Sequence, residues 1–230
     1  MEIVSCILEI IHFMKGKLII IEGIDGSGKT TQTKLLVERL KKQGRVVKSI
    51  HFPQHGHEVF GELVDAYLQG QFGPAPKIDY RLASTLYALD RFEAKSKIER
   101  WLKSGHWVVL DRYAESNFGH QGGKIKNIKK QRQVIEWLYN LDYQILKNPK
   151  PNLVLFLNVP VNNVINLLAK TDKIKDEHEK DVNFLKNSRQ AYLAACQKLK
   201  YWKNIGCVES GQLLPIEKIH EKIWGEIKFH

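Results

Sequence analysis

The chain has 230 residues, of which 43% are hydrophobic and 10% aromatic, an ordinary composition for one sizeable α/β domain. Its net charge of +11 suits ligands that carry several phosphates, although it would equally suit a nucleic acid. Cys6, Cys196 and Cys207 are few, odd in number and without metal-ligand spacing, so we expect reduced thiols in a cytoplasmic protein.

The first thirteen residues differ from the rest of the chain. Residues 3–13 are apolar but are interrupted by Ser5, Glu9 and His12, and the run is too short to cross a bilayer. They also lack the basic region and the cleavage site of a signal peptide. We therefore expect an N-terminal extension over residues 1–13, either a loosely attached arm or a docking helix. A single domain is expected over residues 14–230, and no association with a membrane is expected.

Short apolar runs alternate with helical patterns along this domain. Strands are predicted at five runs: 18–21, 46–51, 107–110, 153–157 and 206–208. Helices are predicted between them at about 30–43, 58–68, 79–103, 134–141 and 161–169. A further helix is predicted after residue 181, ending at about 203, and the last one at 215–228. A Gly-rich and Lys-rich stretch at 119–132 and a charged lid at about 170–181 interrupt this alternation. The pattern predicts a five-stranded parallel sheet with helices on both faces.

The clearest motif is Gly23-Ile24-Asp25-Gly26-Ser27-Gly28-Lys29-Thr30, directly after the first apolar run. Its G-x4-G-K-[ST] spacing predicts a P-loop, in which backbone N–H groups converge on a polyphosphate at the start of a helix. Lys29 is expected to reach the β- and γ-phosphates, and the Thr30 hydroxyl to hold Mg²⁺. The predicted ATP-binding set is Gly23, Gly26, Ser27, Gly28, Lys29, Thr30 and Thr31.

The predicted ends of later strands carry further polar residues. Ligands of an open parallel sheet bind beyond the carboxyl ends of its strands, where Asp111 and Arg112 follow the third run. Asp111 is expected to complete the Mg²⁺ site, and the planar fork of Arg112 suits a second phosphate group. An ordinary surface ion pair is the alternative. The lysines and arginine of 124–132 lack interleaved aromatics, which favours a solvated basic face over a nucleic-acid site.

Taken together, these motifs resemble the thymidylate kinase family over about residues 14–225. The matching segments are 21–32, Phe52-Pro53, 86–93, Asp111-Arg112-Tyr113, Ser116-Asn117, His120-Gln121-Gly122 and 151–157. The resemblance implies ATP-dependent phosphorylation of dTMP to dTDP by in-line phosphoryl transfer, with Mg²⁺ as cofactor. It also implies a homodimer that packs through the long helices.

The resemblance also implies residue roles. Asp25 is similar to the family carboxylate that accepts the 3′-hydroxyl of dTMP, and Tyr87 to the ring that stacks on thymine. Arg91, four residues on, matches the arginine that binds the thymine O4. The implied dTMP-binding set is Asp25, Phe52, Tyr87, Arg91, Arg112, Asn117 and Gln121. The implied catalytic set is Lys29, Asp111 and Arg112, where Arg112 bridges the donor and acceptor phosphates.

The chain departs from the family pattern at three places. Gln54 and His55 stand where an arginine often contacts the acceptor phosphate, and His120 stands near the sugar C2′ in place of a Tyr or Phe. Gly26 replaces an arginine of the loop, a pattern that resembles members whose lid supplies the basic residue. The lid candidates are Lys170 and Lys173.

Two alternative functions are compatible with the P-loop. The first is another nucleoside or nucleotide kinase of the same fold, such as a deoxynucleoside kinase, which would phosphorylate thymidine and not dTMP. The second is a nucleic-acid-dependent ATPase, which would show a steep salt dependence of binding. The sequence favours the dTMP kinase because base-stacking residues accompany the P-loop and no Asn-Lys-x-Asp guanine-reading motif is present.

Overall fold

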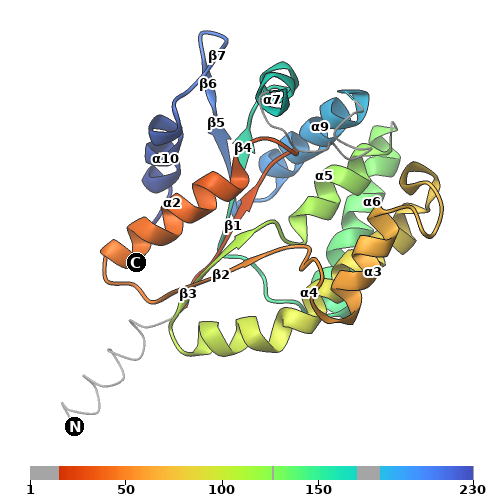
Figure 1. Ribbon diagram of the computed structural model, residues 1–230, viewed down its shortest axis with the longest axis horizontal. Coiled ribbons are helices and arrows are strands. Elements are labelled where there is room, and N and C mark those ends of the chain that lie inside the picture. The colour runs from red at the N-terminus through yellow and green to blue at the C-terminus, as the bar shows by residue number, and fades with distance from the viewer. Residues whose placement is uncertain (1–15, 126, 170–181, 230) are drawn as a thin grey trace.

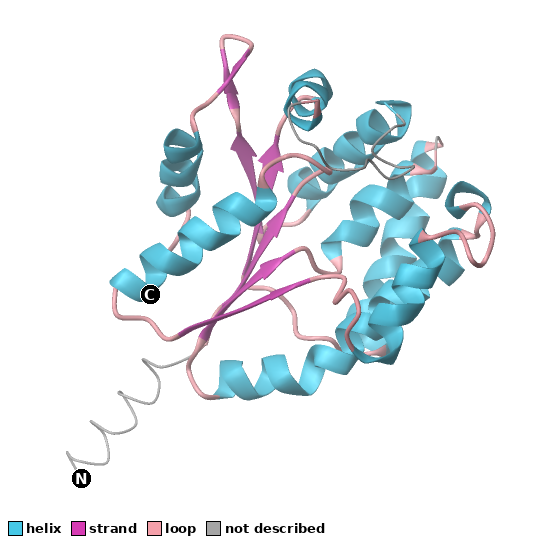
Figure 2. Ribbon diagram, viewed as in Figure 1, coloured by secondary structure: helices cyan, strands magenta, loops and turns pink. Residues whose placement is uncertain are grey.

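Five parallel strands form the centre of the molecule and helices cover both faces (Figure 2). The computed structural model describes residues 16–125, 127–169 and 182–229. The strands lie in the order β2-β3-β1-β4-β5. Their bounds are β1 (Leu18–Glu22), β2 (Val47–His51), β3 (Trp107–Asp111), β4 (Leu153–Asn158) and β5 (Trp202–Gly206). The predicted five-stranded parallel sheet is confirmed.

The sheet is the middle of three layers, with helices packed on each of its faces (Figure 1). One face is covered by α2 (Lys29–Lys42) and α10 (Ile216–Gly225). The opposite face is covered by α4 (Tyr80–Lys103), α5 (Glu115–Gly123) and α9 (Val182–Lys198). Peripheral elements are α3 (Glu58–Leu68), η1 (Ala75–Lys77), α6 (Ile128–Asn140), η2 (Leu141–Ile145) and α7 (Val161–Leu168).

Parallel register brings the polar ends of the strands to one edge of the sheet. Ile21 of β1 is the partner of Asp111 in β3 and of Leu155 in β4, and His51 of β2 is also the partner of Asp111. The residues that follow these positions therefore emerge side by side. This edge carries the predicted site.

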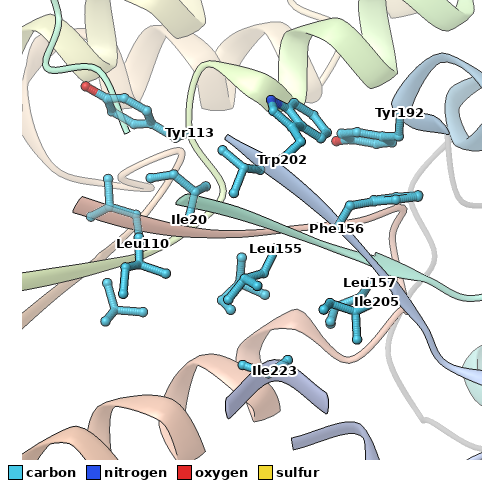
Figure 3. Close-up of a cluster of buried hydrophobic side chains, with 14 of the residues drawn as sticks. Ile20, Leu110, Tyr113, Leu155, Phe156, Leu157, Tyr192, Trp202, Ile205 and Ile223 are labelled. Atoms are coloured by element: carbon cyan, nitrogen blue, oxygen red, sulfur yellow. The ribbon is translucent and has the colours of Figure 1, made fainter. Parts of the chain in front are cut away.

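The core follows from the alternation of side chains along buried strands. Figure 3 shows Phe156 and Trp202 on the same side as Tyr192 of α9, while Leu157 and Ile205 point toward Ile223 of α10. The rings of Phe156 and Tyr192 stack with centroids 5.0 Å apart. Because β4 is apolar at successive positions, it buries side chains on both faces, as a central parallel strand must.

The Gly-rich and Lys-rich stretch at 119–132, which precedes the helix predicted at 134–141, is itself predicted to contain no helix. This prediction is wrong, because α5 occupies 115–123. Its glycines reflect close packing against α9 and not an irregular loop. A Cβ at Gly119 would collide with the Tyr192 ring, and one at Gly123 would lie 2.8 Å from the Ser188 backbone nitrogen. Helix propensity alone disfavours glycine here, but the close contact between the two helices overrides it.

The predicted position of the fifth strand is also wrong. The strand is β5, at 202–206, and α9 already ends at Lys198 rather than near 203. Among the described residues, β5 pairs with β4 alone and is therefore an edge strand. It exposes Lys203 and Asn204, so its sequence lacks the continuous apolar run of a central strand. The segment after it forms a two-stranded hairpin, β6 (Val208–Glu209) and β7 (Gln212–Leu213).

Two further predictions concern residues outside those that the structure describes: the N-terminal extension at 1–13 and the lid at 170–181. Within the described ranges, no helix is both long and apolar enough to cross a membrane. On α4, the apolar residues Leu82 and Phe92 are exposed, whereas Ala83, Ala88 and Ile98 are buried. Part of the apolar stripe of this long helix therefore faces away from the core.

Candidate active site

The P-loop connects β1 to α2, as its spacing predicts. Gly26 and Gly28 adopt positive φ angles of 75° and 87°, a conformation that glycine reaches without steric cost. A Cβ at Gly26 would also lie 2.8 Å from Cγ of Leu168 in α7. Backbone geometry and side-chain contact therefore both require glycine here. This leaves the loop without the arginine seen in part of the family.

Lys29, at the start of α2, is buried inside the loop. Its Nζ donates a hydrogen bond to the carbonyl of Ile24 at 2.9 Å and lies 4.0 Å from Oδ1 of Asp25. Burial and the nearby Arg112 guanidinium lower the pKa of Lys29 to about 8, against the opposing effect of Asp25 and Asp111. A polyphosphate entering the loop would favour the charged ammonium.

Thr30 and Asp111, the two residues predicted to hold Mg²⁺, are in contact with each other. The Thr30 hydroxyl donates to Oδ2 of Asp111 at 2.7 Å, and His51 Nδ1 lies 3.2 Å from the same oxygen. Burial raises the pKa of Asp111, but hydrogen bonds from His51 and Thr30 and the charge of Lys29 outweigh it and hold the pKa below its usual value. Oδ1 of Asp111 is buried with no hydrogen-bond partner among the described residues. A carboxylate and a hydroxyl are the oxygen donors that Mg²⁺ prefers, so the residues fit the cation.

Arg112 follows Asp111 and joins the P-loop to the neighbouring cleft. Its φ of 69° is uncommon for a residue with a Cβ and turns the chain sharply at the end of β3. The guanidinium pairs with the carboxylate of Asp25 and also donates from Nη1 to the Gly23 carbonyl at 3.4 Å and to His120 Nε2 at 3.1 Å. Arg112 therefore contacts the P-loop on one side and α5 on the other.

A cleft of about 360 Å³ lies next to the P-loop. Its lining contains all seven residues predicted for dTMP binding: Asp25, Phe52, Tyr87, Arg91, Arg112, Asn117 and Gln121. It also contains His51, His55 and His120, the last two at positions where the chain departs from the family pattern. A space of this size can hold a mononucleotide. The structure therefore brings together residues spread over nearly one hundred positions of sequence.

One end of the cleft holds Arg91 in a buried ion pair that the sequence analysis missed. Nε and Nη2 of Arg91 donate to the two carboxylate oxygens of Asp142 at 2.9 and 3.0 Å. Nη1 donates to the Tyr113 carbonyl at 3.4 Å, and Asn148 Nδ2 donates to Asp142 at 3.0 Å. The ion pair fixes the guanidinium plane on the same side of α4 as Tyr87, which also lines the cleft. Asp142 stands in η2, between the predicted helix and strand, where no motif marks it.

Glu22 is a second buried carboxylate that the sequence analysis did not single out. Its carboxylate accepts hydrogen bonds from Tyr113 N at 2.9 Å, Ser116 Oγ at 2.9 Å and Tyr192 Oη at 3.0 Å. Burial raises its pKa, while the charge of Arg112 and the hydrogen bonds from Tyr113 and Ser116 act in the opposite direction. One side chain at the end of β1 thus ties together α5, α9 and the turn after β3. The sign available in the sequence was an acidic residue at the end of an otherwise apolar strand.

The remaining predicted residues lie as follows. The Ser27 hydroxyl is buried with no hydrogen-bond partner in the described part of the chain, and Thr31 is exposed at the start of α2. Asn117 Nδ2 donates to the Ser84 carbonyl at 3.3 Å, and the Gln121 side-chain oxygen is buried without a partner among the residues described. Lys170 and Lys173 lie outside the described residues.

The fold and the site together define a class of protein. The structure has a parallel sheet with a P-loop after its first strand, an acidic residue at the end of β3 followed by an arginine, and an adjoining nucleotide-sized cleft. These are the features of a P-loop kinase. The sequence also matches the thymidylate kinase family over residues 21–223. The chain therefore belongs to the thymidylate kinase family.

Individual relatives support the same assignment. The thymidylate kinase of Plasmodium falciparum is 33% identical over 213 residues, which cover 93% of this chain and 90% of that protein. The human thymidylate kinase is 28% identical over 210 residues, covering 91% of this chain and 88% of the other. A solved structure of thymidylate kinase from Candida albicans superposes with a TM-score of 0.71 at 25% identity, covering 92% and 90% of the two chains. As a family member, this chain is a phosphotransferase that phosphorylates dTMP at the expense of ATP.

Proposed function

We propose that ATP binds to the P-loop and dTMP to the adjoining cleft, and that the γ-phosphoryl group passes in line between them at Arg112. The observation that supports this most strongly is the position of Arg112. It pairs with Asp25 of the P-loop and also lines the cleft. A guanidinium at that junction can bind oxygens of both donor and acceptor phosphates.

The transfer requires little covalent chemistry from the protein. The acceptor is the 5′-phosphate of dTMP, which is anionic near neutral pH, so no strong general base is needed. The chain must instead hold two anions in line and neutralise the charge of the transferred group. Lys29 and Arg112 supply two positive charges, and the backbone amides of the P-loop supply hydrogen bonds to the phosphates.

We assign the cation site to Thr30 and Asp111. The support is the hydrogen bond between them and the buried Oδ1 of Asp111, which has no partner among the described residues. Mg²⁺ held by these two residues would supply positive charge that neutralises part of the charge on the ATP phosphates. His51 orients the Asp111 carboxylate from the side of β2.

We assign the base of dTMP to the end of the cleft formed by Tyr87, Arg91, Asn117 and Gln121. Tyr87 is an aromatic surface for the pyrimidine ring. Arg91 is fixed by Asp142, so a base that accepts a hydrogen bond from it would meet a preorganised donor. We assign the 3′-hydroxyl to Asp25, and we place Phe52 beside the sugar and phosphate.

We also propose a cytoplasmic homodimer. Its support is the large apolar side chains exposed on α3 and α4, helices that pack together: Val59, Leu82 and Phe92. Exposed apolar side chains on a helix pair can form part of a contact with a second copy. Light scattering over a dilution series is expected to give the dimer mass, and Phe92→Lys to shift it toward the monomer. A monomeric wild-type chain at micromolar concentration would refute this part of the proposal.

The test of function is a coupled assay with ATP and a panel of acceptors: dTMP, dUMP, dCMP, dGMP, UMP and thymidine. We expect dTMP to be the preferred acceptor, and Arg112→Ala to lower kcat by roughly 100-fold or more. Arg132→Ala, which removes an exposed arginine on α6, is the matched control and should leave kcat unchanged. Phosphorylation of thymidine without that of dTMP would refute the assignment in favour of a nucleoside kinase.

A further inference from the structure

His120 lies directly against Arg112. Nη1 of Arg112 is 3.1 Å from Nε2 of His120. A guanidinium can only donate hydrogen bonds, so Nε2 of His120 must act as the acceptor. This requires the neutral imidazole with its proton on Nδ1, because a protonated ring offers no acceptor and adds a second positive charge.

The packing of α5 against α9 holds the imidazole in place. The Phe184 ring stacks on it with centroids 5.9 Å apart and planes 23° from parallel. The Tyr192 ring meets it edge-on at 6.0 Å. Tyr192 is itself anchored, since its hydroxyl donates to Glu22 at 3.0 Å. Gly119 allows this close approach, because a Cβ there would collide with Tyr192.

Arg112 has three kinds of partner, and they differ in their response to pH. The Asp25 carboxylate and the Gly23 carbonyl remain acceptors through the neutral range. His120 is the partner whose acceptor disappears on protonation. The charged and titratable groups that act on Arg112 at this contact are Asp25, Glu22, Asp111, Lys29 and Tyr192, and the cleft also contains His51, His55 and Arg91.

We propose that neutral His120 is a positioning residue, which holds the Arg112 guanidinium in line between the donor and acceptor phosphates and releases it on protonation. This rests on the assignment of Arg112 to the phosphates. If His120 served only to fill space between α5 and α9, an aromatic ring would replace it without loss. If it positions Arg112, the acceptor atom is what matters.

Two substitutions separate these cases. His120→Gln places an amide oxygen close to the position of Nε2 and cannot be protonated in this pH range. His120→Phe keeps a ring for Phe184 and Tyr192 but removes the acceptor. His57→Gln is the control, because His57 is exposed at the start of α3 and does not line the cleft.

The experiment measures kcat and KM for dTMP from about pH 5.5 to about pH 8.5, the range over which an imidazole titrates. At the alkaline end we expect His120→Phe to lose roughly tenfold in kcat with little change in KM, and His120→Gln to stay within about twofold of wild type. At the acid end, wild type should lose roughly tenfold more activity than His120→Gln. The phosphate of dTMP titrates equally in all assays, so the ratio of wild type to variant removes its contribution.

Other results would overturn the proposal. Equal kcat for wild type and His120→Phe at all pH values would reduce His120 to a packing residue. Parallel pH profiles of wild type and His120→Gln would refute the claim that protonation of His120 releases Arg112. This comparison does not depend on His120→Phe and can be made even if that variant fails to fold. A wild-type chain without activity on dTMP would instead refute the proposed function itself. Failure of the proposed function can therefore be told apart from failure of the proposed role of His120.

Discussion

Loss of the Asp142 carboxylate is expected to destabilise the protein more than loss of any exposed ion-pair partner. Arg91 is only 2% exposed and Asp142 is fully buried, and two hydrogen bonds of 2.9 and 3.0 Å join them. Asp142→Asn removes the negative charge and turns an amide N–H₂ toward a donor, leaving an uncompensated buried guanidinium. Breaking a buried pair in this way costs about 3–5 kcal/mol. Because typical domains are stable by about 5–15 kcal/mol, this is a large fraction of the total.

The measurement is the free energy of unfolding from urea titrations of wild type and variant. Glu221→Gln is the matched control, because Glu221 pairs with Arg39 at 2.6 Å but is 65% exposed, and its loss should leave the free energy of unfolding nearly unchanged. The Asp142→Asn protein should also show a raised KM for dTMP, since Arg91 lines the cleft. A loss of stability below about 1 kcal/mol would show that the pair does not hold this part of the core.

Two further substitutions test the packing and the buried charge of α5. Gly119→Ala should destabilise the protein by about 1–3 kcal/mol, because its Cβ would collide with the ring of Tyr192. Gly225→Ala is the control: a Cβ there meets no atom within 4 Å, so this variant should be neutral or stabilising. Thermal melts compare the two variants, and equal melting temperatures would contradict the close contact between α5 and α9. Burial raises the pKa of Glu115 to about 8 in the folded protein, although Tyr143 donates to it at 2.6 Å. Its folded pKa lies above its unfolded value, so its stability contribution is complete below about pH 4.5 and is lost as the pH rises through about 8. Glu115→Gln should therefore flatten the fall in stability over that window, and an unchanged slope of unfolding free energy against pH would contradict it.

The sequence predicted the order of the central elements because most strands are buried on both faces. Such strands appear as continuous apolar runs, as in the first strand and in β4, and their positions were close to those observed. The fifth strand was misplaced because an edge strand exposes polar side chains such as Lys203. Helix α5 was missed because its glycines serve a tertiary contact with Tyr192, and no local pattern reports such a contact.

The candidate site could be predicted where a motif fixes its geometry. The P-loop, Asp111 and Arg112 follow from spacing and from strand ends, and the seven residues assigned to dTMP do line one cleft. The supporting groups could not be predicted in this way. Asp142 reaches Arg91 across 51 positions of sequence, and the contact of His120 with Arg112 depends on the angle at which α5 leaves the turn after β3.

The most direct test of phosphoryl transfer at the P-loop is the steady-state rate of dTMP phosphorylation by Lys29→Ala. Lys29 is buried in the loop, whereas Lys34 is exposed on the same helix, so Lys34→Ala is the matched control. We expect Lys29→Ala to lose roughly 100-fold or more in kcat while its circular dichroism spectrum stays unchanged, and Lys34→Ala to retain full activity. A folded Lys29→Ala protein with near-normal kcat for dTMP would contradict the proposed mechanism.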